Sequence, residues 1–262
     1  MYAGSVPTLL IVVLNVVPVA AFALIHGRLI YGRRGILLFT VLCLSTGTFF
    51  ESLSLRTGFP FGHYYFTDVM GPKVFQLPVL LALAYLGMGY LSWTVTVAIA
   101  GYQRDRLSGL RLFQLPLLAS FVMVAWDLSM DPIWTYIGRA WVWTSGGAYF
   151  GVPVSNFAGW FLTVYTFYQA FALYLARQPE RADERQLPRS RLGSAVLFYA
   201  ASAAGNLLVR APRGMAATVV DPSGRQWRVA DMIAANALVS VLLMGAFAVT
   251  AWSELSKDGS EN

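Results

Sequence analysis

Charged residues are scarce in this chain. Asp, Glu, Lys and Arg make up 12% of its 262 residues, and hydrophobic residues make up 57%. Soluble proteins carry about 25% charged residues, so the composition excludes an ordinary soluble domain and predicts a membrane protein. The apolar length is better divided into spanning helices of about 20 residues each.

Cysteine, histidine and lysine are also rare, and each scarcity excludes a class of function. Cys43 is the only cysteine, so it has no partner for an intramolecular disulfide and is expected to pack as a small apolar residue. The two histidines, His26 and His63, are too few for the histidine-rich di-iron site of a membrane desaturase. The two lysines, Lys73 and Lys257, lie outside the middle of any expected helix, so retinal has no Schiff-base donor.

Cofactor and nucleic-acid motifs are missing too. The chain has no Gly-x-Gly-x-x-Gly fingerprint for a flavin or nicotinamide. An Asp-x-x-x-Asp spacing could hold Mg²⁺ on a prenyl diphosphate, but a second acidic cluster and basic residues for the diphosphate are not evident. The net charge of +6 is explained by basic residues at helix ends, which face anionic lipid head groups. We therefore expect no cofactor, no metal and no nucleic-acid partner.

The apolar stretches predict an all-α, polytopic membrane helix bundle of about seven transmembrane helices. The expected helices run over residues 5–26, 35–55, 75–100, 112–136, 153–176, 192–209 and 229–252 of a single integral membrane domain, residues 1–262. The odd-numbered connections and the C-terminal tail carry 12 Lys and Arg, and the even-numbered connections carry 7. By the positive-inside rule, the N-terminus is predicted outside and the C-terminus in the cytoplasm, in the cell membrane.

Two carboxylates in the fourth expected helix are the most informative feature. Asp127 and Asp131 are four residues apart and therefore share a helix face. Acids inside a membrane are costly and mark functional sites. Burial and mutual repulsion favour the protonated form of these acids. Pro132 is expected to end the helix at Asp131, and the negative end of a helix also disfavours an anion. A general acid needs such a retained proton. The alternative is that one aspartate pairs with Arg139 or Arg210 and only joins helices.

Four other polar residues are weaker candidates. Glu51 is the second acid, and its alternative role is to pair with Arg56. His63 and Asn156 could hold a water molecule, but a loop histidine often serves only as a hydrogen-bonding residue, and an asparagine often caps or packs a helix. Asp68 either contacts substrate or orders its loop.

Aromatic residues gather in two connections on the same predicted side as the acids. Three glycines and two prolines interrupt residues 58–73, so we expect a folded cap there. The aromatic residues form either an interfacial belt or the wall of a cavity whose π faces stabilise a cation. The residues expected to contact substrate in such a cavity are Phe59, Tyr64, Trp126, Trp143 and Trp160.

These features favour cofactor-free acid chemistry on an apolar substrate dissolved in the bilayer. Protonation of a trisubstituted alkene gives a tertiary carbocation. Capture by water gives an alcohol, and capture by a second alkene gives a ring. A function of another class stays open, namely a non-catalytic transporter or lipid-binding protein whose polar cluster is a permeation site.

Three segments resemble the CruF-type carotenoid biosynthesis proteins. The first is Gly-Phe-Pro-Phe-Gly-His-Tyr at 58–64 with Tyr65, Thr67-Asp68 and Gly-Pro-Lys at 71–73. The second is Trp126-Asp127 with Asp131-Pro132. The third is Tyr-Phe-Gly-Val-Pro at 149–153 with Ser-Asn-Phe at 155–157 and Gly159-Trp160. The resemblance implies a multi-pass membrane protein that acts on long isoprenoid polyenes. It also implies addition of water across the terminal 1,2 double bond of an acyclic end, as in γ-carotene or bisanhydrobacterioruberin, without a redox cofactor. The resemblance assigns no catalytic residues, so the roles given above are our own.

Overall fold

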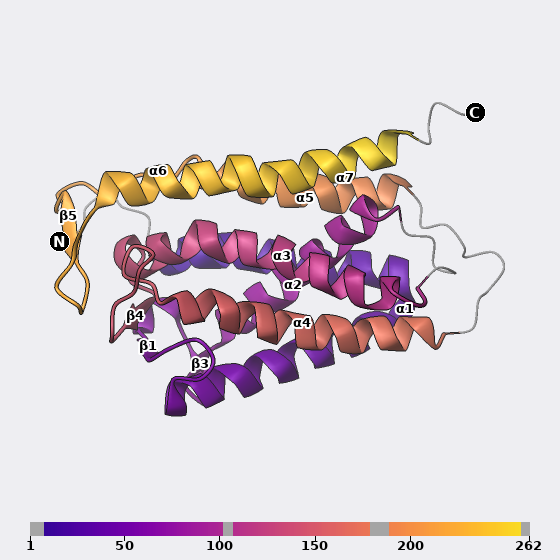
Figure 1. Cartoon of the computed structure of the whole chain (residues 1–262), viewed down its shortest axis with the longest axis horizontal. Coiled ribbons are helices and arrows are strands. Elements are labelled where there is room, and N and C mark those ends of the chain that lie inside the picture. Colours follow the sequence, from indigo (N-terminus) through magenta and orange to yellow (C-terminus); the bar gives the residue numbers. More distant parts are fainter. Residues whose placement is uncertain (1–7, 102–106, 179–188, 258–262) are drawn as a thin grey trace.

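The structure is a computed structural model that describes residues 8–101, 107–178 and 189–257. It is mostly helical, which confirms the predicted class at that level (Figure 1). The helices are α1 (Thr8–Thr57), α2 (Val79–Ile99), α3 (Arg111–Pro132), α4 (Val154–Ala176), α5 (Arg189–Asn206), α6 (Val229–Val239) and α7 (Gly245–Lys257). Two wider helical turns, η3 (Ile133–Ile137) and η4 (Ser240–Met244), extend α3 and join α6 to α7.

Helix α1 consists of two helices that meet at Gly32. A straight helix of 50 residues would be about 75 Å long, more than twice the hydrocarbon thickness of a bilayer. Gly32 has φ 71° and ψ 176°, which breaks the helical backbone. A Cβ atom on Gly27 would lie 2.3 Å from Cδ1 of Ile36, so the segments on either side of the break pack against each other. The halves of α1 correspond to the expected helices 5–26 and 35–55.

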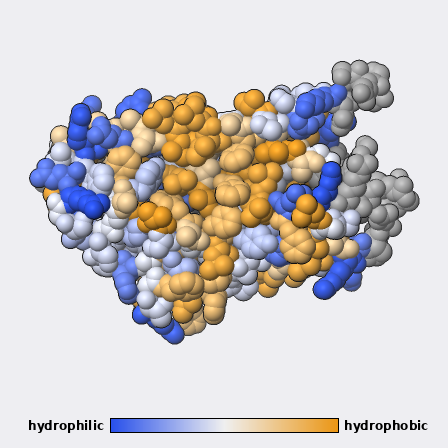
Figure 2. Space-filling view, viewed as in Figure 1, coloured by the Kyte–Doolittle hydropathy of each residue, from blue (hydrophilic) through white to orange (hydrophobic). Residues whose placement is uncertain are grey.

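Four helical segments of the described chain are long and apolar enough to cross a membrane. They are Thr8–Thr57, Val79–Ile99, Arg111–Ile137 and Val229–Lys257. The surface agrees, because hydrophobic side chains dominate the middle of the molecule and hydrophilic ones gather toward its two ends (Figure 2). These helices and this surface indicate a membrane protein. The count of seven spans and the orientation of the termini stay predictions.

The expected helix 75–100 begins too early. The structure places a hairpin of β2 (Lys73–Val74) and β3 (Leu77–Pro78) before α2. Its turn residues Phe75 and Gln76 have φ values of 49° and 70°, a left-handed conformation that no α-helix contains. The apolar composition of this segment hid the turn, because hydropathy does not report backbone conformation.

The expectation that Pro132 ends its helix at Asp131 is wrong. Pro132 has no N–H for the carbonyl of Leu128 four residues earlier, yet the chain continues through η3 to Ile137. The hydroxyl of Tyr149 donates to the Leu128 carbonyl at 3.0 Å. A side chain from the next connection therefore satisfies the carbonyl that proline leaves free, and Asp131 does not lie at a helix end.

The expected cap is present at one end of the bundle. Strand β1 (Tyr64–Phe66) pairs antiparallel with β4 (Trp141–Trp143), so the connection after α1 is joined to the connection after α3. A short helix, η1 (Asp68–Met70), follows β1. The hairpin of β5 (Thr218–Val220) and β6 (Gln226–Arg228) lies toward the same end of the molecule (Figure 1).

The cap touches α4 at Gly159. A Cβ atom there would lie 2.6 Å from Cδ1 of Phe61 and 3.0 Å from the carbonyl oxygen of Pro60. The Pro60 oxygen is a backbone atom, so a side chain at position 159 would clash unless the backbone of the cap moved. The absence of a side chain at Gly159 thus allows the loop and the helix to approach closely.

We predict that Gly159→Ala lowers the stability of the protein by about 1–3 kcal/mol, the usual effect of overpacking. Gly205→Ala is the matched control, because a Cβ atom on Gly205 in α5 would meet nothing within 4 Å. Alanine should leave stability unchanged there or raise it slightly, since glycine is a poor helix former. The thermal midpoints of the variants in detergent compare the two, and equal midpoints would contradict the close contact.

Candidate active site

Three carboxyl groups lie buried near the capped end of the bundle. Glu51 of α1 is 4% exposed, and Asp127 and Asp131 of α3 are each 1% exposed. The cap links Glu51 to Asp131, because Tyr64 donates to Glu51 and its strand partner Trp143 donates to Asp131. No lysine or arginine among the described residues forms a salt bridge with any of the three. Neutral donors must therefore stabilise whatever negative charge this cluster carries.

The ion pairs considered as alternatives do not form in the structure. Arg210 donates to the backbone carbonyls of Leu207 and Val209. Arg139 is exposed at the start of the segment that leads into β4. Arg56 lies in a hollow on the surface of α1. A purely structural role for the acids as partners of these arginines therefore has no support among the described contacts.

Asp131 accepts four hydrogen bonds. Its Oδ1 atom accepts from Nε1 of Trp141 at 2.9 Å, Nε1 of Trp143 at 3.3 Å and Oγ1 of Thr135 at 2.9 Å. Its Oδ2 atom accepts from Nδ2 of Asn156 at 2.7 Å. Four donors are the complement that an ionised carboxylate can accept. The surroundings of Asp131 suit the anion.

Asp127 has a different environment, although it shares the same amide. Its Oδ2 atom accepts from Nδ2 of Asn156 at 3.0 Å. Its Oδ1 atom is buried and has no partner among the described residues. A protonated carboxyl group suits such a place better than an anion, because an unpaired neutral group costs less to bury than an unpaired charge. The pair thus combines one fully hydrogen-bonded carboxyl group with one that has a free oxygen.

Glu51 is held by two tyrosines. The hydroxyl of Tyr85, on α2, donates to Oε1 at 2.7 Å, and the hydroxyl of Tyr64, on β1, donates to Oε2. Burial, followed by the neighbouring charge of Glu51, raises the pKa of Tyr64 well above its ordinary value. Tyr64 is therefore a neutral donor at physiological pH, and the cap supplies part of the site.

Four of the aromatic residues predicted from the sequence surround this cluster. Trp160 stacks on Tyr85 with ring centres 4.4 Å apart, and Trp126 lies edge-on to Trp160 at 6.2 Å. Tyr64 and Trp143 have ring centres 4.9 Å apart. All except Trp126, which is half-buried, are buried. These rings line the interior, so the interfacial belt does not describe them.

A cavity of about 200 Å³ reaches the cluster on the Glu51 side. It lies between the second half of α1, the start of α2 and the β2–β3 hairpin. Its lining includes Glu51 and Tyr85 but neither aspartate. The remaining lining is almost entirely apolar. Among the three acids, Glu51 is therefore the one in contact with this space.

Three predicted site residues lie elsewhere in the cap. His63 is exposed, and a Cβ atom on Gly58 would lie 2.6 Å from its Nε2 atom, so its ring covers that glycine. Phe59 is 57% exposed. Asp68 is exposed and forms a salt bridge of 2.9 Å with Lys73, which lowers the pKa of Asp68. The structure does not bring these residues to the acids, and their roles stay predictions.

The structure also adds residues that the sequence reasoning missed. Tyr85, Thr135 and Trp141 all donate to the carboxyl groups. Trp141 could have been found, because it is two residues from Trp143 and so shares its face if the segment is a strand. Tyr85 gives no such signal, since it stands in a helix that is apolar all round.

We predict that Asp131→Asn destabilises the folded protein more than Asp127→Asn does. An amide at 131 would turn an NH₂ group toward one of the present donors and leave it unpaired, at a cost of about 1–3 kcal/mol. An amide at 127 can keep the bond from Asn156 and place its NH₂ at the unpartnered position. Chemical or thermal unfolding in detergent measures both, and a larger loss for Asp127→Asn would refute these assignments.

A comparison with known families identifies the family of this chain. Residues 7–221 match the model of a family described as carotenoid biosynthesis protein. Neither a curated protein nor a solved structure matches the chain. The matched segment contains the cap, all three acids and the helices α1 to α5. It covers most of the chain and confirms the resemblance seen in the sequence: the chain belongs to the carotenoid biosynthesis protein family.

Proposed function

We propose that this protein adds water to a terminal C=C bond of an acyclic carotenoid or related isoprenoid, through a tertiary carbocation. The observation that carries this proposal is the cluster of three buried carboxyl groups, without a basic partner among the described residues, beside an apolar cavity. Such a cluster can store a proton close to an apolar substrate. Family membership supports carotenoid biosynthesis as the setting.

The first step is proton transfer. A carboxyl group of the cluster, with Asp127, Asp131 and Glu51 as the candidates, gives its proton to the less substituted carbon of the alkene. The π electron pair forms the new C–H bond, and the positive charge stays on the tertiary carbon. The faces of Trp160, Tyr85 and their neighbours and the remaining carboxylates stabilise this cation.

The second step is capture by water. The oxygen of a water molecule forms a C–O bond with the tertiary carbon and releases one proton to the carboxylates. The net reaction adds H and OH across the double bond and restores the acid, so no oxidant or reductant is needed. Asp127 suits the second step, because its Oδ1 atom has no donor among the described residues and can accept a hydrogen bond from the water.

The experiment uses membranes that contain the full-length protein, γ-carotene or bisanhydrobacterioruberin as substrate, and H₂¹⁸O as solvent. We expect a tertiary alcohol that carries ¹⁸O, detected by mass spectrometry. A product that lacks the label would exclude direct hydration. An isomer of the substrate, with no gain of water, would instead select an intramembrane cyclase that uses the same protonation.

We predict that Asp127→Asn lowers the hydration rate by about 10²-fold or more, the usual contribution of a general acid or base. The rate should be compared per amount of folded protein, and Asp231→Asn on α6 is the control, because Asp231 is exposed and lines neither described cavity. Full function of both Asp127→Asn and Asp131→Asn would favour a non-catalytic transporter or lipid-binding protein over either enzyme.

A further inference from the structure

Resting on the proposed function, we propose that the cavity beside Glu51 receives the methyl-branched end of the polyene from the surrounding bilayer, and that Glu51 delivers the proton. This assigns a binding site for one end of the substrate. It also divides the roles of the three acids, which the sequence could not do.

The cavity leads from the protein surface to the acid. Its inner wall is formed by buried residues that include Gly47, Glu51 and Tyr85. Its outer wall includes Val74 and Phe75 of the β2–β3 hairpin, which are 57% and 85% exposed. The outer wall is apolar and stands beside α1 and α2, two of the candidate membrane spans. A substrate dissolved in lipid can therefore reach Glu51 without crossing water.

The side chains that line the cavity indicate which kind of ligand it can bind. The cavity's polar side chains are Thr48 near the surface and Glu51 and Tyr85 within. The lining contains no basic residue that could bind a diphosphate or another anion. An uncharged hydrocarbon end fits such a lining, and its alkene would meet one carboxyl group, Glu51. Asp127 and Asp131 line neither described cavity, so they lack access to the same alkene.

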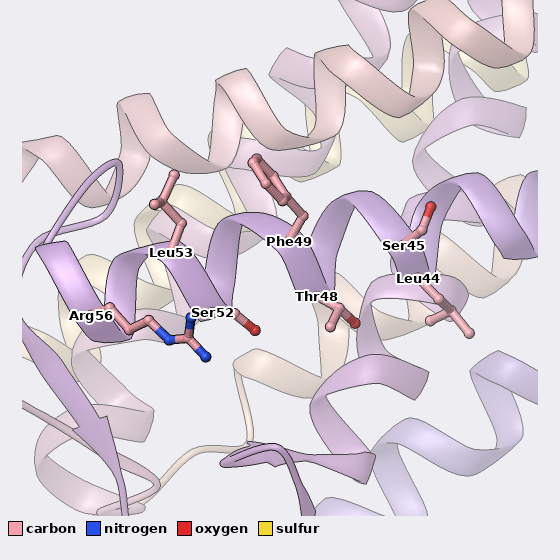
Figure 3. A pocket seen from close by; sticks show the side chains of 7 residues that line it. All are labelled: Leu44, Ser45, Thr48, Phe49, Ser52, Leu53 and Arg56. Atoms are coloured by element: carbon pink, nitrogen blue, oxygen red, sulfur yellow. The ribbon is translucent and has the colours of Figure 1, made fainter.

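Size indicates that only one end of the substrate enters. Pockets that enclose a whole small ligand measure about 300–1,000 Å³, and this cavity measures about 200 Å³. The rest of a long polyene must lie outside it. A hollow of about 590 Å³ continues along α1 from the same Leu44 and Thr48 (Figure 3). It follows one stripe of the helix as far as Arg56, and Leu44, Phe49 and Leu53 supply apolar surface there for the polyene.

The hydrogen bonds that Glu51 accepts make it a suitable proton donor to the alkene. When its O–H bond breaks and the C–H bond of the substrate forms, the resulting carboxylate accepts the hydroxyl groups of Tyr64 and Tyr85. Such charge-assisted bonds are stronger than neutral ones, so they favour release of the proton. Tyr85 also lines the cavity, and its ring stacks on Trp160, which places aromatic faces beside the new cation. The proton released by water returns to the carboxylates of the cluster and restores Glu51 as the proton donor.

Two variants separate substrate binding from proton delivery. Ala82→Leu fills the cavity, because Ala82 lines it and is half-buried. We expect KM for γ-carotene to rise about tenfold or more. Glu51→Gln keeps a group that can bond to both tyrosine hydroxyls but has no acidic proton. We expect kcat to fall about 10²-fold or more with little change in KM. Ala201→Leu on α5 is the matched control, because Ala201 is exposed and lies outside the lining.

Binding is also measured without turnover. Purified full-length protein in phosphatidylcholine vesicles is titrated with γ-carotene, whose polyene quenches tryptophan fluorescence. Wild type, Glu51→Gln and Ala201→Leu should bind alike, and Ala82→Leu should bind at least tenfold more weakly. Thermal midpoints confirm that each variant is folded.

The outcomes distinguish the two proposals. If wild type hydrates γ-carotene but Ala82→Leu retains its affinity or Glu51→Gln retains its rate, the assignment of the cavity or of the donor is wrong while hydration stands. If wild type binds γ-carotene through the cavity but adds no labelled water, hydration is wrong and the binding site stands.

Discussion

Burial of three carboxyl groups without a cationic partner among the described residues is the constraint on which the capped end of this structure depends. Burying an unpaired carboxylate costs several kcal/mol, so neutral hydrogen-bond donors from several segments are needed to stabilise these acids. They are supplied by Tyr64 and the two indoles of the β1–β4 pair, by Tyr85 of α2, by Thr135 of η3 and by Asn156 of α4. The cap and the helical segments α2, η3 and α4 are therefore joined to the acids by hydrogen bonds.

The backbone of α3 meets a related constraint. Pro116 and Pro132 each remove a hydrogen bond from the carbonyl four residues before them. Gln169 of α4 donates to the carbonyl of Leu112 at 3.2 Å, and Tyr149 donates to that of Leu128. Both carbonyls that the prolines leave free are thus satisfied by side chains from outside α3. These bonds fix α3 against its neighbours at both ends, which keeps Asp127 and Asp131 at a constant position relative to Asn156.

Sequence reasoning found the acids because their signal is strong and local. A carboxylate in an apolar stretch is unusual, and a spacing of four residues fixes a shared face whatever the rest of the fold does. It also found Asn156, Trp160 and the cap. It could not find the pairing of β1 with β4, because strands of three residues have no measurable periodicity. It considered Arg56 as a partner of Glu51, although five residues along a helix turn side chains about 140° apart. The true partners of Glu51 come from distant segments, which no local pattern reports.

The division between one acid in contact with the cavity and two enclosed acids has an energetic consequence for the proposed reaction. At an effective dielectric constant of about 20, opposite charges about 8 Å apart attract by about 2 kcal/mol. That is roughly thirtyfold in rate if the attraction exists only in the cationic transition state. A carboxylate in contact with the cation could also bond to it and trap it as an ester, and at Glu51 the hydroxyl groups of Tyr64 and Tyr85, which occupy one carboxylate oxygen each, oppose this. Asp131, fully hydrogen-bonded and lining neither described cavity, can supply negative potential without reaching the carbon. In the proposed mechanism, enclosure of this anion thus lets it stabilise the cation while leaving capture to water.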